Sequence, residues 1–290
     1  MENSTDTIYK YIRRSVSAEL EVSALLRLNR HYESKFRSNF YSIFAFMEKG
    51  QAESILKLKN ENIKIKRSRG TASYIPREVY VKSKSVASSE TNIAWSGMNF
   101  NIFGSLDLLS FFEVPFLFDC ESSEKIKVIN QELYNLELEK NKESIHAIVK
   151  CKRLCLEMLE LILALSPFKK DGIEKLIGVR EFFPVINYIN GNYQQKISNS
   201  DLARMMHLSL SRFIHKFKFS MGVSPQQYIQ QRRFLNISRL LASTNLRINE
   251  IASEHGFSSQ FHFSNAFKSA TGYSPQQYRK LLKEGALFCN

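Results

Sequence analysis

The chain contains Gly222-Val223-Ser224-Pro225-Gln226-Gln227-Tyr228 and, 50 residues later, Gly272-Tyr273-Ser274-Pro275-Gln276-Gln277-Tyr278. The similarity extends upstream, because the pair Phe213 and Phe217 also returns after 50 residues. Two copies are fewer than the three or more repeats that a solenoid needs. The sequence therefore predicts two copies of one supersecondary unit.

Each copy has the pattern of a short helix, a tight turn and a second helix. In the first copy, Ser198 is placed to cap a helix over residues 199–206, and Ser209 is placed to cap a second helix that ends near residue 221. In the second copy, the short helix covers residues 249–254, and Ser258 or Ser259 begins the following helix. This is the helix-turn-helix pattern, in which the second helix lies in the major groove of DNA.

The second helix of each copy has a buried and an exposed face. Phe213 and Phe217 are four residues apart and so share the buried face, and helical geometry places polar residues on the opposite face. Such side chains read base edges or bind phosphates. A longer helix over residues 228–241 joins the copies and adds two arginines for phosphate contacts. The candidate DNA-binding residues are Ser209, Ser211, Arg212, Ile214, His215, Lys216 and Lys218 in the first copy, Ser258, Gln260, Phe261, His262, Asn265 and Lys268 in the second, and Arg232 and Arg233 on the joining helix.

The charge distribution agrees with an anionic partner. The 290 residues carry a net charge of +13, and the last 100 residues hold 13 Lys or Arg against 4 Asp or Glu, a net charge of +9. The first 190 residues have a net charge of only +4. A basic C-terminal third is typical of nucleic-acid binding, with a membrane surface as the alternative.

Several other classes of protein are disfavoured by the sequence. The N-terminus lacks the basic and apolar regions of a signal peptide, and no apolar run approaches the length of a membrane span. Four cysteines are too few for a disulfide scaffold. We therefore expect a cytoplasmic protein without a membrane partner and without a cofactor.

The N-terminal part contains short alternating runs between residues 39 and 118, such as Ile63-Lys64-Ile65-Lys66. Such alternation indicates strands with one buried face, and many short strands predict a small barrel or sandwich. A barrel of this size holds either packed side chains or one small ligand. Residues 39–118 contain no His and no Cys, which argues against a metal site there. Residues 5–37 are interpreted as a helix or an arm.

Residues 121–165 have the apolar spacing of two helices. These helices either cover the barrel or form a dimer seam, and the two roles are compatible. Cys151 and Cys155 lie on the second helix and are interpreted as core cysteines. A Pro- and Gly-containing break follows, so the predicted domains are an arm and barrel over residues 1–120, a helical segment over 121–166, a linker over 167–179 and a DNA-binding domain over 180–285.

The duplicated region resembles the AraC/XylS family of transcription regulators. The residues that carry the resemblance in the second copy are Ile251-Ala252, Gly256-Phe257-Ser258, Phe263, Phe267-Lys268, Gly272, Ser274-Pro275 and Tyr278-Arg279. The first copy fits as well but has His207 where the family usually has glycine. The resemblance implies an α+β protein with a cupin-like N-terminal barrel and helices, followed by an all-α domain of two helix-turn-helix units joined by a long helix. The two units would enter successive major grooves roughly 34 Å apart.

The sequence thus predicts a DNA-binding transcription regulator, an activator, and not an enzyme, because no nucleophile and base, phosphate loop or metal cluster is present. The predicted partners are double-stranded DNA, RNA polymerase, a small-molecule effector in the barrel and a second copy in a homodimer. The alternative is an interaction protein whose N-terminal half captures another regulator, with DNA binding secondary.

Overall fold

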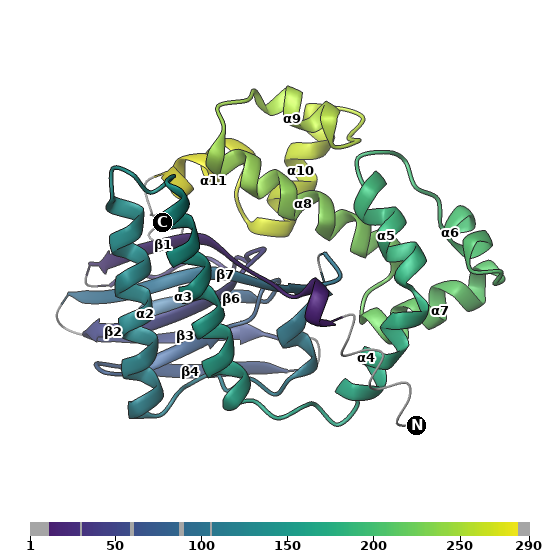
Figure 1. The fold of residues 1–290 in the computed structure, drawn as a ribbon. Helices are drawn as coiled ribbons and strands as arrows, with labels where there is room; N and C mark the ends of the chain where they lie inside the picture. Colours follow the sequence, from purple (N-terminus) through teal and green to yellow (C-terminus); the bar gives the residue numbers. More distant parts are fainter. Residues whose placement is uncertain (1–11, 30, 59–60, 87–89, 105, 284–290) are drawn as a thin grey trace. The chain divides into compact units, whose positions relative to one another are not determined.

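The structure is a computed structural model that describes residues 12–29, 31–58, 61–86, 90–104 and 106–283 (Figure 1). The chain forms two compact units. The helical unit consists of Met1–Ser17, Phe100–Glu113 and Ser166–Phe263, and the sheet unit consists of Ala18–Asn99, Val114–Leu165 and Ser264–Asn290. The first 11 residues of the predicted arm and residues 284 and 285 of the predicted DNA-binding domain lie outside the described residues.

Two antiparallel sheets build the strand-rich region. One sheet has the order β1-β7-β2-β5, with β8 paired to β7, and the other has the order β4-β3-β6. The hydrogen bonds between described residues do not close these sheets into a continuous barrel. The α+β class is confirmed, with two facing sheets in place of a closed barrel. The strands are β1 (Ser17–Leu28), β2 (Ser42–Lys49), β3 (Gln51–Lys57), β4 (Asn62–Ser68), β5 (Ala72–Ile75), β6 (Tyr80–Ser85), β7 (Thr91–Ile102) and β8 (Leu106–Asp107).

The three-stranded sheet has one charged face and one buried face. Residues alternate between the faces of a strand, so in β3 Glu53 points outward and Ser54 points inward. Outside, Glu53 pairs with Lys64 at 3.1 Å and with Lys84 at 3.4 Å. These lysines lower the pKa of Glu53, chiefly through the hydrogen bond from Lys64. The inner face of this sheet is turned toward the buried strand β2 (Figure 1).

Helices α2 (Cys120–Leu138) and α3 (Ile145–Ala164) run across the five-stranded sheet (Figure 1). α2 is joined to the sheet through Asn130, whose Nδ2 donates to the carbonyl oxygens of Phe44 at 3.0 Å and Ala94 at 3.3 Å. The two predicted helices between residues 121 and 165 are therefore confirmed. Cys155 is buried and Cys151 is partly buried, as expected for residues at or near the core.

The interpretation of residues 5–37 as a helix or an arm is wrong for the segment that forms β1. Residues 18, 24, 26 and 28 of this strand are buried, and residues 25 and 27 are exposed. A spacing of four residues fits both a helical period and an even-numbered strand period, so Leu20, Ala24 and Leu28 were compatible with either structure. Tertiary pairing with β7 decides for the strand.

The helical unit contains α4 (Gly172–Glu181), α5 (Phe183–Asn192), α6 (Asn199–Met205), α7 (Leu210–Met221), α8 (Pro225–Ser243), α9 (Ile248–Glu254) and the first residues of α10 (Gln260–Thr271). The last helix, α11 (Pro275–Lys283), belongs to the sheet unit. The chain does break after α3, as predicted, but α4 occupies much of the range 167–179. None of the described helices combines the length and apolarity required to cross a membrane.

Candidate nucleic-acid interface

The same turn holds the two helices of each helix-turn-helix unit. In the first unit the amide of Leu208 donates to the carbonyl of Ala203 at 3.0 Å, and in the second the amide of Phe257 donates to the carbonyl of Ala252 at 3.1 Å. The residue before each donor has a left-handed backbone, with φ of 52° at His207 and 71° at Gly256. His207 therefore adopts the conformation expected of the glycine that it replaces.

Serine side chains begin both recognition helices, α7 and α10. The Oγ of Ser209 accepts a hydrogen bond from the amide of Arg212 at 3.4 Å. In the second unit, Oγ of Ser259 accepts from the amide of His262 at 3.1 Å, so Ser259 rather than Ser258 is the cap. Capping leaves other amides of the first turn open for an external oxygen, such as a phosphate.

Aromatic residues fix the inner side of both recognition helices. All four phenylalanines of the two pairs, Phe213, Phe217, Phe263 and Phe267, are 0 % exposed. The rings of Phe217 and Tyr228 pack edge to face, with 5.9 Å between their centroids. The equivalent pair of the second copy, Phe267 and Tyr278, packs in the same way at 5.1 Å. The burial predicted for these pairs is confirmed, and it fixes which side of each helix faces outward.

The outward sides carry the predicted DNA-binding residues. In α7 and its cap, the exposed members of the set are Ser209, Ser211, Arg212, His215 and Lys218, whereas Ile214 is partly buried. In the second unit, Ser258, Gln260, Phe261, His262, Asn265 and Lys268 are all exposed. Phe261 is 76 % exposed, an unusual environment for a phenylalanine next to polar residues. Each helix therefore presents a mixed polar and aromatic face.

Three of the predicted basic contacts are engaged inside the helical unit. The Nζ of Lys216 lies 3.0 Å from Oε2 of Glu181 on α4. Arg233 donates from Nε to the carbonyl of Tyr193 at 2.6 Å and from Nη2 to the carbonyl of Gln195 at 2.7 Å, and burial lowers its pKa. The guanidinium of Arg232 lies over the ring of Tyr193, 5.3 Å from its centroid. These side chains tie α7 to α4 and α8 to the segment that follows α5.

His255, just before the turn of the second unit, is buried and makes two hydrogen bonds. Its Nδ1 lies 2.9 Å from the carbonyl oxygen of Ile251, and its Nε2 lies 3.0 Å from Nδ2 of Asn236 on α8. A carbonyl can only accept, so Nδ1 carries the proton and Nε2 accepts from Asn236. Burial lowers the pKa of His255, which keeps this arrangement neutral.

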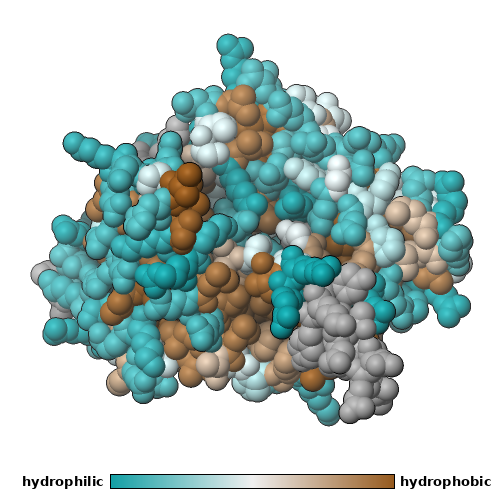
Figure 2. Space-filling view, in the orientation of Figure 1, coloured by the Kyte–Doolittle hydropathy of each residue, from teal (hydrophilic) through white to brown (hydrophobic). Residues whose placement is uncertain are grey.

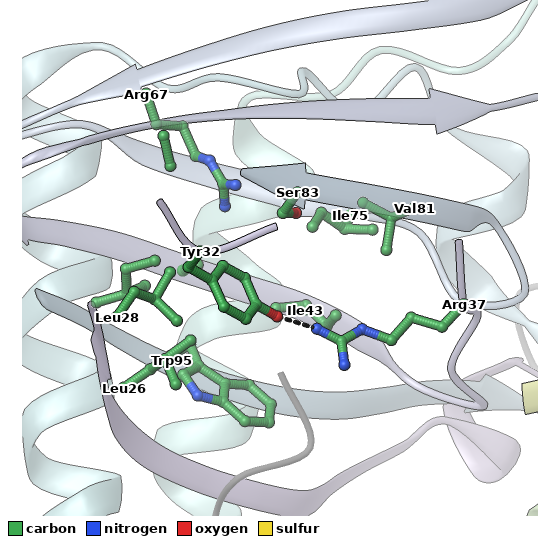
Figure 3. Close-up of a pocket in the computed structure, with 13 residues that line it drawn as sticks. Leu26, Leu28, Tyr32, Arg37, Ile43, Arg67, Ile75, Val81, Ser83 and Trp95 are labelled. Carbon is green, nitrogen blue, oxygen red and sulfur yellow. Dashed lines mark hydrogen bonds between the residues drawn. The ribbon is translucent and has the colours of Figure 1, made fainter. Parts of the chain in front are cut away.

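A separate cavity of about 40 Å³ lies between the two sheets (Figure 3). Apolar side chains such as Leu28 and Ile43 line it, together with Trp95, Tyr32 and two arginines, Arg37 and Arg67. The Arg37 Nη2 donates to the hydroxyl of Tyr32 at 2.6 Å, and its Nη1 donates to the hydroxyl of Tyr273. No group of three His, Cys, Asp or Glu suited to a metal occurs in the described part of the chain.

Comparison with known proteins identifies the duplicated region. Residues 202–281 match a family model described as a helix-turn-helix domain. Curated relatives that match part of the chain are transcription regulators. The duplicated region is a helix-turn-helix domain, and the resemblance to the AraC/XylS family of transcription regulators is confirmed. The prediction that the protein is not an enzyme agrees with these relatives, which are transcription regulators.

Two relatives show the extent of the similarity. The chain is 36 % identical over 120 residues to LumQ, a probable transcriptional regulator of Photobacterium leiognathi, covering 41 % of this chain and 47 % of that protein. It is 33 % identical over 129 residues to VirF, a virulence regulon transcriptional activator of Yersinia enterocolitica, covering 44 % of this chain and 48 % of that protein. The chain thus spans about half the length of these AraC/XylS-type relatives.

One solved structure resembles nearly the whole chain. ToxT from Vibrio cholerae O395 aligns with a TM-score of 0.58 over 93 % of this chain and 98 % of its own, at 16 % identity. A second structure of ToxT, with a bound unsaturated fatty acid, aligns with the same TM-score at 15 % identity. At this identity the similarity establishes a common fold, which includes the N-terminal sheets as well as the AraC/XylS-type region.

Arg67 is the residue of interest that sequence reasoning did not single out. The alternation Ile63, Ile65, Arg67 places its side chain on the inner face of β4, and this alternation was visible in the sequence. The neighbouring residues Lys64 and Lys66 are exposed, so the strand looked like one with a basic outer face. Arg67, the basic residue that points inward, was therefore overlooked.

Proposed function

We propose that the chain is a sequence-specific DNA-binding transcription regulator in which both helix-turn-helix units contact DNA. The observation that supports this most strongly is the similarity of the two recognition helices, α7 and α10. Each has a buried pair of phenylalanines on one side and an exposed, mainly polar face on the other. Exposed Asn and Gln side chains suit adenine, and basic side chains suit guanine or phosphate. Phe261 suits the methyl group of thymine.

Within this proposal the predicted residues take different roles. Ser211, His215 and Lys218 on α7, and Gln260, Phe261 and Asn265 on α10, are proposed to meet base edges. The other exposed members are proposed to meet phosphates: Ser209, Arg212, Ser258, His262 and Lys268. Lys216, Arg232 and Arg233 have partners inside the protein, so their proposed role is chiefly to hold α7 and α8 in place.

We propose that the regulator is an activator that works in the cytoplasm with RNA polymerase. The similarity over 129 residues to a transcriptional activator of Yersinia enterocolitica supports this direction of regulation. The cavity between the sheets is proposed as the effector site, and the common fold with a ToxT structure that contains a fatty acid supports a ligand role for this part of the chain.

A homodimer through α3 is also proposed. Ile145, Val149 and Leu156 of this helix are exposed, with Val149 61 % exposed. Figure 2 shows apolar surface where Figure 1 places α3. Helices with such a stripe commonly pair with a second helix. The alternative role of the N-terminal half, capture of another regulator, would use the same surface.

The proposed function is tested by selecting duplexes that bind the full-length protein from a random pool. Enrichment of a defined sequence is the expected result. Binding to the selected duplex is then compared for Lys218→Glu, which reverses a charge on the exposed side of α7, and Lys140→Glu, a matched change at an exposed site before α3. We expect loss of binding and of promoter activation only for Lys218→Glu. Full promoter activity in the Lys218→Glu variant would favour the interaction-protein alternative.

A further inference from the structure

Arg67 is a buried cation in the wall of the cavity between the two sheets. Its side chain comes from β4, opposite Ala52 on β3, and the residue is 6 % exposed. Figure 3 shows it entering the cavity on the side opposite Arg37, with Tyr32 between them. Burial lowers the pKa of Arg67 to about 10, so the guanidinium remains charged at neutral pH.

The protein offers this charge little compensation. Nη2 of Arg67 donates to Oγ of Ser54, and that hydroxyl also lies 2.7 Å from Oγ of Ser83. The Nε of Arg67 is buried and has no hydrogen-bond partner among the described residues. No acidic side chain of the described chain forms an ion pair with it. A buried cation normally has an anionic partner, because leaving water without one is costly.

The other arginine of the cavity has a different environment. Arg37 donates to the hydroxyls of Tyr32 and Tyr273, so its guanidinium is already satisfied by protein groups. Glu53, the acidic residue of the neighbouring strand β3, points to the outer face of that strand and pairs with lysines there. The Nε edge of Arg67 is therefore an open hydrogen-bonding position on a cation that lines this cavity.

The size and lining of the cavity restrict the anion. One water needs a cavity of about 10–15 Å³, so a cavity of about 40 Å³ has room for a few heavy atoms. Apart from the arginines, Tyr32 and Ser83, the walls are mainly apolar, with Leu26, Leu28 and Ile75 among them. The Arg67 guanidinium suits a ligand with one negative charge, and the apolar walls suit a short carbon chain attached to that charge.

We propose that this cavity binds a short-chain monocarboxylate, whose carboxylate accepts hydrogen bonds from Arg67. This inference rests on the proposed effector role of the cavity and adds the ligand class and the residue that holds it. Arg67 presents its planar guanidinium from a strand, and such a group binds carboxylates with two parallel hydrogen bonds. Ser83 would supply a further hydroxyl near the charged end.

Trp95 provides a direct probe, because it lines the cavity and is the only tryptophan in the chain. The full-length protein is titrated with propionate and butyrate, with propionamide as an uncharged analogue and with octanoate as a long one, at constant ionic strength. We expect a saturable change in tryptophan fluorescence with the short carboxylates and at least about tenfold weaker binding of the amide. Equal binding of carboxylate and amide would overturn the proposal, and tighter binding of octanoate would overturn the size limit.

Arg67→Gln should weaken propionate binding at least about tenfold, whereas Arg69→Gln, an exposed arginine two residues later, should leave it unchanged. Unchanged affinity in Arg67→Gln contradicts the assignment. If Arg67→Gln does not fold, the comparison of propionate with propionamide on the unaltered protein decides the question. Binding to the selected DNA is measured in parallel. An unaltered protein that binds the selected DNA but no short carboxylate rejects only this inference, and an unaltered protein that binds neither rejects the proposed function as well.

Discussion

His207 and Gly256 occupy the same position in the two helix-turn-helix units, and both have a left-handed backbone, with φ of 52° and 71°. The amide that follows each of them donates to the carbonyl five residues earlier in the short helix. The turn geometry is thus kept although one copy has a residue with a side chain. A left-handed conformation costs a non-glycine residue about 1–2 kcal/mol. The first turn therefore stores strain that the second lacks.

The variant His207→Gly should stabilise the first unit by about 0.5–1 kcal/mol, because relief of strain exceeds the extra entropy of glycine in the unfolded chain. Hydrogen exchange of the α6 and α7 amides in the full-length protein measures this local stability. The reciprocal variant Gly256→Ala should destabilise the second unit, because its Cβ would collide with the backbone oxygen of Gln194. If hydrogen exchange of the α6 and α7 amides is not slowed in His207→Gly, the turn is unstrained.

Acid should destabilise the second unit through His255. Its pKa in the folded protein is lowered by burial, so below the ordinary imidazole value of about 6.5 the unfolded chain binds a proton that the folded chain does not. Stability is therefore present above pH 6.5 and falls as the pH decreases, by at most about 1.4 kcal/mol per pH unit.

Urea unfolding between pH 7.5 and 5 measures this dependence in the unaltered protein and in His255→Gln. His255→Gln should reduce the decrease in the free energy of unfolding with falling pH. His215→Gln, at an exposed position of α7, should leave this pH dependence unchanged. Identical slopes in the unaltered protein and His255→Gln would remove His255 as the cause.

Two phenylalanines two residues apart in α10 should respond oppositely to truncation. Phe263 is 0 % exposed, so Phe263→Ala should lower the stability of the second unit by about 3–5 kcal/mol. Phe261 is 76 % exposed, so Phe261→Ala should change stability little and weaken binding to the selected DNA. Thermal unfolding and fluorescence anisotropy of a labelled duplex test the two effects. A Phe261→Ala variant that is destabilised but binds DNA with full affinity would contradict both the exposed position and the DNA contact assigned to Phe261.

Lys268 and Asn265 should separate affinity from specificity. Lys268→Ala should weaken binding to all duplexes and reduce the slope of log affinity against log salt by about one. Asn265→Ala should relax the preference at one base pair by about 1–3 kcal/mol. Lys140→Ala and Asn141→Ala, at exposed sites before α3, are the matched controls. An unaltered base preference in Asn265→Ala would exclude Asn265 from base reading.

The sequence predicted local features better than long-range partners. The serine caps, the turn at His207 and the burial of Phe263 follow from short-range patterns, and the structure contains all of them. The pairing of Lys216 with Glu181 joins residues 35 positions apart, so no local pattern contained it. Arg233 likewise donates to carbonyl groups about 40 residues upstream, and no local pattern indicated these internal hydrogen bonds.

The N-terminal part illustrates the same limit. Alternation predicted strands, but β1 was mistaken because a spacing of four fits helices and strands alike. The assignment of strands to two sheets depends on pairing between distant segments, such as β2 with β7. The alternation along β4 indicated that Arg67 points inward, but the cavity that it lines depends on how the two sheets assemble.

The central claim is that two helix-turn-helix units read one stretch of DNA, and a hydroxyl-radical footprint of the full-length protein on a selected duplex tests it most directly. We expect two protected segments on one face of the duplex, about 10 base pairs apart from centre to centre. Lys218→Glu should remove protection at one segment first and Lys268→Glu at the other. A single protected segment that responds to changes in only one of the two helices would contradict the claim.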